Sequence, residues 1–200
     1  MVHPVLYLAN IIDYMRFFFM LLPIFMQDPV LCLVSFTVSD LLDMFDGYFA
    51  RKLKQSSFLG ACLDMSLDRA SSTIISMKII CSKQVSLLIQ RILILFVLID
   101  LVSHWLRYSY GCKAQTHHKQ VQSRFSALNF YYAQKVFMTF LCFAYEAFLL
   151  STFWFVNGVQ IQTATFVMKS MSAFAVYKVF LSVLQLIDSI EKLAEMDKKE

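Results

Sequence analysis

Four aspartates between residues 43 and 68 are the side chains whose type and spacing point most directly to chemistry. The stretch reads DMFDGYFARKLKQSSFLGACLDMSLD. Asp43 and Asp46 are three residues apart, and Asp64 and Asp68 are four apart, so each pair would lie on one face of a helix. Two such pairs facing each other form an all-oxygen site, which hard divalent cations such as Mg²⁺ and Mn²⁺ prefer. The spacing therefore predicts a metal site shared by two helices.

The residues between the two pairs suit the binding of a phosphate group. Gly47 and Gly60 allow close approach of the backbone. Arg51 carries a guanidinium that can hold a phosphate through two hydrogen bonds, and Ser57 offers a hydroxyl donor. We therefore expect a phosphate-bearing substrate next to the metal site.

The composition indicates that these groups belong to a membrane protein. Of the 200 residues, 58% are hydrophobic and 16% are charged, against roughly 25% charged residues in a typical soluble domain. The mean hydropathy is +0.60. At about 20 residues per span, six spans use about 120 residues, which leaves short loops and room for one domain, residues 1–200. Charged side chains at membrane depth are costly and usually functional.

We accordingly expect an all-α integral membrane protein with six transmembrane helices and a charged cytosolic tail at about 191–200. The helices are predicted at about 7–26, 30–50, 58–81, 85–110, 128–156 and 161–190. Basic residues gather on one side of this arrangement, whereas Lys83 alone falls in the turns of the other side. Those on the basic side are Arg51, Lys52, Lys54, Arg107, Lys113, Lys119, Arg124, Lys192, Lys198 and Lys199. This bias places both termini in the cytosol.

Polar side chains outside the 43–68 stretch fall in the same cytosolic half, although successive helices run in opposite directions. They include Asp13, Arg16, Asp100, Ser103, His104, Arg107, Lys135, Lys178 and Asp188. A pocket that is lined by several helices and open at the cytosolic interface explains this shared depth. Glu146 lies near the middle of its span and has no evident partner.

The 43–68 stretch also resembles a family signature, D-x2-D-G-x2-A-R-x8-G-x3-D-x3-D. Every fixed position is matched, by Asp43, Asp46, Gly47, Ala50, Arg51, Gly60, Asp64 and Asp68. The pattern is that of the CDP-alcohol phosphotransferases, integral membrane enzymes that make phospholipid headgroups. The resemblance implies that the four aspartates bind two Mg²⁺ or Mn²⁺ ions and that Asp68 is the general base. It further implies that Gly47, Arg51 and Ser57 bind CDP-diacylglycerol.

Further motifs resemble the eukaryotic phosphatidylinositol synthases. They are FLGACLDMSLDRASST at 58–73, DLVSHWLRYS at 100–109, His117 to Lys119, and Tyr131-Tyr132 followed by Lys135. The candidate acceptor-binding residues are Ser103, His104, Arg107, Tyr131 and Lys135. Two positions depart from the family pattern, because Phe125 stands where an Asn is expected and Lys135 where an Arg is expected. The resemblance covers about residues 10–150 and fades in the last helix.

This resemblance implies transfer of a phosphatidyl group from CDP-diacylglycerol to myo-inositol, giving phosphatidylinositol and CMP. It also implies an endoplasmic reticulum membrane location, an active site facing the cytosol, membrane lipids as surroundings and a homodimer; nothing suggests a nucleic-acid partner. The same chemistry with glycerol 3-phosphate or serine as acceptor stays open. A third reading is a non-catalytic membrane scaffold or transporter of this fold, against which the intact spacing of the aspartates argues.

Overall fold

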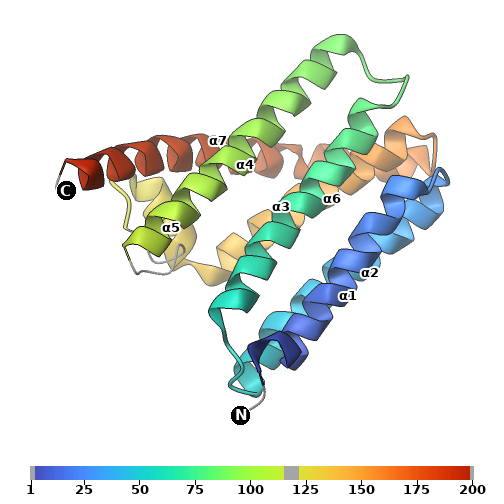
Figure 1. Ribbon diagram of the computed structural model, residues 1–200. Coiled ribbons are helices and arrows are strands. Elements are labelled where there is room, and N and C mark those ends of the chain that lie inside the picture. The colour runs from blue at the N-terminus through green and yellow to red at the C-terminus, as the bar shows by residue number, and fades with distance from the viewer. Residues whose placement is uncertain (1–2, 115–121, 199–200) are drawn as a thin grey trace.

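The computed structural model describes residues 3–114 and 122–198, which form helices without strands. A 3₁₀ helix at Pro4–Leu6 precedes seven α-helices (Figure 1). These are α1 (Leu8–Phe25), α2 (Pro29–Lys52), α3 (Phe58–Ile80), α4 (Leu87–Lys113), α5 (Ser126–Ala133), α6 (Lys135–Val156) and α7 (Ile161–Asp197). The all-helical class is thus confirmed for the described part of the chain.

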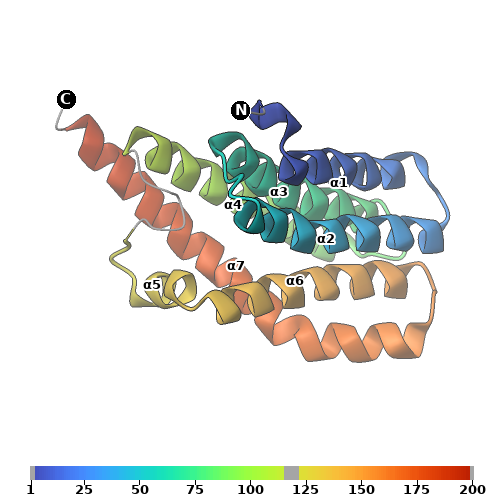
Figure 2. The same ribbon diagram turned by 90° about the horizontal axis from the view of Figure 1, so that it is seen from below.

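The helices alternate in direction, so that functional segments far apart in sequence meet at one end. Figure 2 shows the N-terminus, the α2–α3 connection, α5 and the C-terminus toward that end. The α1–α2, α3–α4 and α6–α7 connections lie at the opposite end. The start of α1, the end of α2 and the start of α3 are therefore neighbours, which brings the four aspartates together.

Capping residues set where α2 and α3 begin and hence where their aspartates point. Asp28 Oδ1 accepts hydrogen bonds from the backbone N–H groups of Val30 and Leu31 at 2.8 and 2.9 Å, and proline occupies the first helical position. Ser57 Oγ accepts from the Gly60 N–H at 3.0 Å. Ser57 thus starts α3 two turns before Asp64, in addition to its predicted role in binding.

An apolar cluster at the far end joins α2, α3, α6 and α7. Its buried members are Cys32, Phe36, Ile75, Ile79, Val85, Tyr145, Leu149, Phe153, Val156 and Ala175. In a lipid environment such helices associate by van der Waals packing rather than by exclusion from water. Dense packing at this end leaves the other end of the bundle to polar side chains.

Four of the six predicted spans are long and apolar enough to cross a membrane, namely α1, α4, α6 and α7. The helices α2 and α3 fall outside this group of candidate spans; they carry the aspartates of the 43–68 stretch. Large apolar side chains on α4 face outward, with Leu88 67% and Trp105 65% exposed. The protein is therefore a multi-pass membrane protein, and the number of spans is considered again below.

The predicted helix at 128–156 is wrong in one respect, because it is broken at Gln134. That residue has φ −94° and ψ 84°, outside the helical region. The break lets α5 turn and pack Leu128 and Tyr131 against Leu141 of α6 and Leu181 of α7. The predicted tail also differs, since α7 continues as a helix to Asp197.

The contact between Gly60 of α3 and Asn10 of α1 is close enough to test. A Cβ at Gly60 would lie 2.8 Å from Asn10 Oδ1, while Asn10 Nδ2 is held by the Pro4 carbonyl at 2.8 Å. We expect Gly60→Ala to lower stability by about 1–3 kcal/mol through overpacking. In an Asn10→Ala background the clash is gone, and the better helix propensity of alanine should add up to about 1 kcal/mol.

Thermal unfolding of the four proteins in detergent measures this coupling. Equal effects of Gly60→Ala in the two backgrounds would show that the α1–α3 approach does not depend on this contact.

Candidate active site

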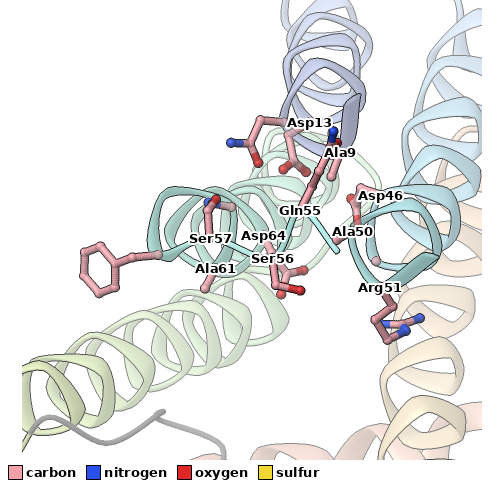
Figure 3. Close-up of a pocket in the computed structure, with 14 residues that line it drawn as sticks. Ala9, Asp13, Asp46, Ala50, Arg51, Gln55, Ser56, Ser57, Ala61 and Asp64 are labelled. Carbon is pink, nitrogen blue, oxygen red and sulfur yellow. The ribbon is translucent and has the colours of Figure 1, made fainter. Parts of the chain in front are cut away.

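A cavity of about 450 Å³ lies between the start of α1, the end of α2 and the start of α3. Its polar lining includes Asn10, Asp13, Asp46, Arg51, Gln55, Ser56, Ser57 and Asp64 (Figure 3). Gly47 and Gly60 also line this cavity. We call this space the first cavity. All three residues predicted to bind CDP-diacylglycerol therefore line one cavity.

A second cavity, of about 170 Å³, lies on the other side of the aspartates. It is lined by Asp43, Asp64, Met65, Asp68, Arg69, His104, Tyr131, Tyr132, Met138, Thr139, Cys142 and Lys178. Its volume is below the roughly 300–1,000 Å³ of drug-sized ligand sites, which suits a small polar molecule. Asp64 lines both cavities, so each of them borders the carboxylates.

Three of the four predicted metal ligands form a compact group. Carboxylate oxygens of Asp43, Asp64 and Asp68 lie within 4.8 Å of one another. An all-carboxylate donor set at this spacing fits a hard divalent cation. Asp46 is outside this group. Its Oδ2 atom lies 3.1 Å from Nη1 of Arg16.

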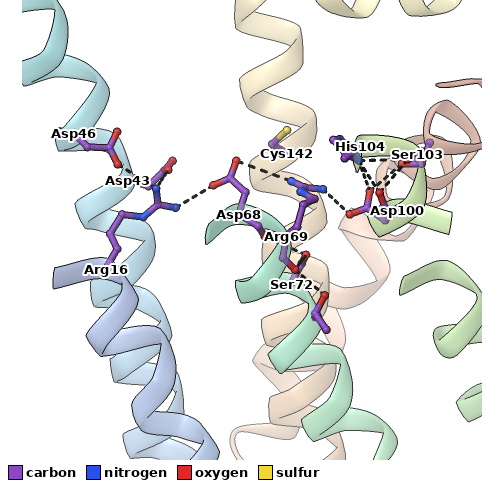
Figure 4. A network of polar contacts seen from close by, with 12 residues as sticks. Arg16, Asp43, Asp46, Asp68, Arg69, Ser72, Asp100, Ser103, His104 and Cys142 are labelled. Atoms are coloured by element: carbon purple, nitrogen blue, oxygen red, sulfur yellow. Dashed lines mark hydrogen bonds and ion pairs between the residues drawn. The ribbon is translucent and has the colours of Figure 1, made fainter. Parts of the chain in front are cut away.

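Arg16 of α1 places its guanidinium among these carboxylates (Figure 4). Its Nη1 lies 2.7 Å from Asp43 Oδ1, and its Nη2 lies 3.0 Å from Asp68 Oδ1. Asp13 Oδ1 is farther, at 3.5 Å from Nη1. The Arg16 side chain is only 3% exposed, and those of Asp13 and Asp46 are 3% and 9% exposed. The side chains of Asp43 and Asp68 are 40% and 30% exposed, so Arg16 joins shielded carboxylates to carboxylates that solvent reaches.

A second arginine continues the pattern on the other side of Asp68. Arg69 Nη2 lies 4.0 Å from Asp68 Oδ2, and Arg69 Nη1 lies 2.6 Å from Asp100 Oδ2 of α4. The other Asp100 oxygen accepts a hydrogen bond from Ser182 Oγ at 3.0 Å and lies 3.4 Å from His104 Nδ1. Acidic and basic groups thus alternate from Asp46 to His104 (Figure 4).

Two buried oxygens at the first cavity lack a hydrogen-bond donor in the described part of the chain. They are Asn10 Oδ1 and Asp13 Oδ1, of which Asp13 Oδ1 forms an ion pair with Arg16 Nη1 at 3.5 Å without a hydrogen bond. Both residues are at most 2% exposed and line the cavity. Buried acceptors without donors are costly, so this wall is suited to a ligand that brings N–H or O–H groups.

The structure brings two of the five predicted acceptor-binding residues, His104 and Tyr131, to the second cavity. Ser103 is fully buried and donates to the Asp100 carbonyl at 3.0 Å. Arg107 pairs with Asp188 at 2.7 Å. Lys135 is exposed at the start of α6. The predicted motif at 117–119 lies outside the described residues.

No binding role was assigned from the sequence to four polar residues that line the second cavity: Arg69, Tyr132, Thr139 and Lys178. Arg69 directly follows Asp68, and Tyr132 directly follows Tyr131, so adjacency was an available signal for both. Lys178 lies in the last helix, where the family resemblance fades. The one sequence signal for it was its predicted depth in the membrane, which it shares with the other polar residues of the cytosolic half.

The paired tyrosines of α5 remain neutral hydroxyl groups. Burial raises the pKa of Tyr132 to about 12 and raises that of Tyr131 as well. Tyr132 Oη donates to Gln185 Oε1, and Tyr131 Oη lies 3.3 Å from Cys142 Sγ. These tyrosines can therefore orient a ligand but do not act as bases near neutral pH.

Comparison with known proteins places this site in a family context. The family model described as CDP-alcohol phosphatidyltransferase matches residues 5–187. A Candida albicans protein named CDP-diacylglycerol–inositol 3-phosphatidyltransferase is 29% identical, covering 96% of this chain and 84% of its own length. The mouse protein of that name is also 29% identical, and the match covers 96% of this chain and 93% of the mouse protein. An Arabidopsis thaliana protein named probable CDP-diacylglycerol–inositol 3-phosphatidyltransferase 2 is 33% identical, and the match covers 70% of this chain and 63% of that protein. No solved structure matches significantly.

The central place of Arg16 gives a prediction about stability. Arg16→Met leaves buried carboxylates without their cation, and removal of one partner of a buried ion pair costs about 3–5 kcal/mol. We expect a lower unfolding temperature, with Mn²⁺ restoring more stability in this variant than in the wild type. Arg91→Met is the matched control, because Arg91 is exposed. Equal unfolding temperatures for the two variants would refute this role of Arg16.

Proposed function

The chain belongs to the CDP-alcohol phosphatidyltransferase family, and on that premise we propose that it transfers the phosphatidyl group of CDP-diacylglycerol to myo-inositol, giving phosphatidylinositol and CMP. The observation that carries this proposal is that Asp64, a member of the carboxylate group, lines both cavities. A donor in one cavity and an acceptor in the other would bring their reacting atoms together at the carboxylates. Relatives named for the inositol reaction occur in fungi, animals and plants.

The first cavity takes the CDP part of the donor. Arg51 binds a phosphate through its guanidinium, and Ser57 donates a hydrogen bond. A Cβ at Gly47 would lie 3.0 Å from Arg51 Nη1, so glycine at this position lets the guanidinium lie against the helix. Asn10 Oδ1, which has no hydrogen-bond donor in the described part of the chain, and the Asp13 carboxylate then accept from N–H or O–H groups of the nucleoside.

Asp43, Asp46, Asp64 and Asp68 are the residues that would hold two Mg²⁺ or Mn²⁺ ions. The fit rests on the close carboxylate oxygens of Asp43, Asp64 and Asp68. Bound divalent ions supply positive charge that neutralises the diphosphate and stabilises the leaving CMP. Arg16 supplies part of that charge from the protein itself, because it already contacts Asp43, Asp46 and Asp68.

In the reaction, an acceptor hydroxyl oxygen bonds to the lipid-side phosphorus as the bond from that phosphorus to the CMP oxygen breaks. The hydroxyl proton passes to Asp68, which acts as general base. Asp68 Oδ1 is engaged by Arg16 at 3.0 Å, whereas Oδ2 has Arg69 at 4.0 Å. The Oδ2 atom is therefore the oxygen better placed to accept the proton.

The charge balance of the second cavity supports a neutral acceptor. It contains three carboxylates, and the cation of Arg69 is already paired with Asp68 and Asp100. An anionic acceptor such as glycerol 3-phosphate would require several unpaired cations clustered together, whereas the described lining offers one such cation, Lys178, beside three carboxylates. His104, Tyr131, Tyr132 and Lys178 instead provide hydrogen-bonding groups for a polyol.

We extend the proposal to the arrangement in the membrane. The helix α2 has 24 residues, and at about 1.5 Å per residue it reaches about 36 Å, enough for a hydrocarbon core of about 30 Å. Its aspartates lie toward one end, which suits six spans with the site at the cytosolic face of the endoplasmic reticulum. The homodimer rests on family resemblance alone.

Incubation of the purified protein with CDP-diacylglycerol, Mg²⁺ or Mn²⁺ and each labelled alcohol in turn tests the function. We expect incorporation of myo-inositol and matching release of CMP. Incorporation of serine or glycerol 3-phosphate with inositol inert would instead support another acceptor, and no incorporation of any alcohol would support a non-catalytic protein.

The role of Asp68 can be tested by a change that keeps its size. Asp68→Asn removes the proton acceptor, so we expect loss of CMP release while membrane insertion and elution on gel filtration stay normal. The control is Asp197→Asn, an exposed carboxylate whose only described ion pair is to Lys113 at 3.4 Å. Normal turnover by Asp68→Asn would refute its assignment as general base.

The metal site can be tested without an activity readout. Titration of the metal-free protein with Mn²⁺, followed by electron paramagnetic resonance, should detect two bound ions. Asp64→Asn should weaken binding because Asp64 lines both cavities, whereas Asp197→Asn should not. Undiminished Mn²⁺ binding by Asp64→Asn would contradict this ligand set.

A further inference from the structure

Lys178 of α7 places a buried ammonium at the second cavity. The residue is 4% exposed and lines the cavity together with Asp64, Asp68 and His104. We propose that Lys178 binds the acceptor alcohol, donating hydrogen bonds to its hydroxyl groups. This inference rests on the proposed function and adds a specificity-determining residue from the last helix.

The ammonium of Lys178 has no ion pair within 4.0 Å and no hydrogen-bond partner in the part of the chain that the structure describes. Its nearest described partner is the ring of Tyr131, whose centroid lies 5.5 Å from Nζ. A cation–π contact steadies the charge but satisfies none of the three N–H donors. Lys178 lines the cavity with its N–H donors unpaired in the described part of the chain, so they are suited to a ligand that supplies oxygens.

The nearby carboxylate of Asp100 is already engaged by other groups. Arg69 Nη1 lies 2.6 Å from one of its oxygens, and Ser182 Oγ donates to the other at 3.0 Å. The described hydrogen bonds and ion pairs of Asp100 therefore come from α3, α4 and α7 without Lys178, whose charge acts on Asp100 from beyond ion-pair distance. The donors of Lys178 stay available for a bound molecule.

The backbone of α7 holds Lys178 in place. Ser182, one turn later, donates to the Lys178 carbonyl at 3.3 Å as well as to Asp100. Leu181 is 2% exposed and packs in the cluster with Leu128 and Leu141. These contacts fix the turn that carries Lys178 before any ligand binds, which lowers the entropic cost of binding.

The position of Lys178 also suits the reaction geometry. Lys178 comes from α7, whereas Asp64 and Asp68 come from α3, and all three line one small cavity. An alcohol between them can donate the proton of one hydroxyl to Asp68 while its other oxygens accept from the ammonium. A polyol offers enough hydroxyl groups for both contacts, which a simple alcohol does not.

The decisive variants are Lys178→Met and Lys178→Gln, with Lys169→Met as the matched control on an exposed position of the same helix. Loss of hydrogen bonds from a charged donor should raise KM for myo-inositol about 10- to 100-fold in Lys178→Met. KM for CDP-diacylglycerol should stay within about threefold, because this donor is assigned to the other cavity. Lys178→Gln keeps N–H donors, so it should raise KM for myo-inositol by less than Lys178→Met does.

A binding measurement separates this role from a structural one. In thermal unfolding, CMP should stabilise both the wild type and Lys178→Met, whereas the added stabilisation by myo-inositol should be lost in Lys178→Met. An unfolding temperature lowered in both Lys178 variants, or equal changes in the two KM values, would show a structural role and overturn the inference. Failure of the wild type to use inositol would overturn the proposed function instead.

Discussion

The alternation of acidic and basic side chains from Asp46 to Asp100 is the interaction on which the rest of the structure depends. Arg16 joins Asp46 and Asp43 to Asp68, and Arg69 lies between Asp68 and Asp100. Isolated charges would be prohibitively costly inside an apolar bundle. Because each charge has a neighbour of opposite sign on another helix, the same contacts that make the charges tolerable also set the relative positions of α1, α2, α3 and α4.

This network divides the interior into two cavities with different chemistry. The first is bordered by α1, α2 and α3, and it holds a guanidinium and acceptor oxygens suited to a nucleotide. The second adds α4, α5, α6 and α7, and it holds tyrosines, a histidine and a lysine suited to a polyol. Asp64 lines both. Under the proposed function, two pockets bordered by the same carboxylate would place the reacting atoms of the two substrates next to each other.

The two ends of the bundle differ in how they contribute to function. At one end, apolar packing around Phe36, Ile75 and Leu149 joins four helices. At the other end, polar groups line cavities and the helices are held by ion pairs. The break at Gln134 belongs to this polar end, since it turns α5 so that Tyr131 and Tyr132 face the second cavity. Apolar packing at one end thus holds the helices together, so that the other end can contain cavities lined by charged side chains.

The aspartate spacing and the hydropathy of the chain were enough to predict a helical membrane protein with a carboxylate site, because helical periodicity is a local property. The residue types between the aspartate pairs, together with the family resemblance, also identified Gly47, Arg51 and Ser57, which line one cavity together. The second cavity depends on contacts that no local pattern encodes, such as the packing of α7 against α4 that brings Ser182 to Asp100. Only the tertiary structure could show that Lys178 lines the same cavity as Asp64 and Asp68 and that Arg16 lies among the aspartates, since both depend on how helices distant in sequence pack together.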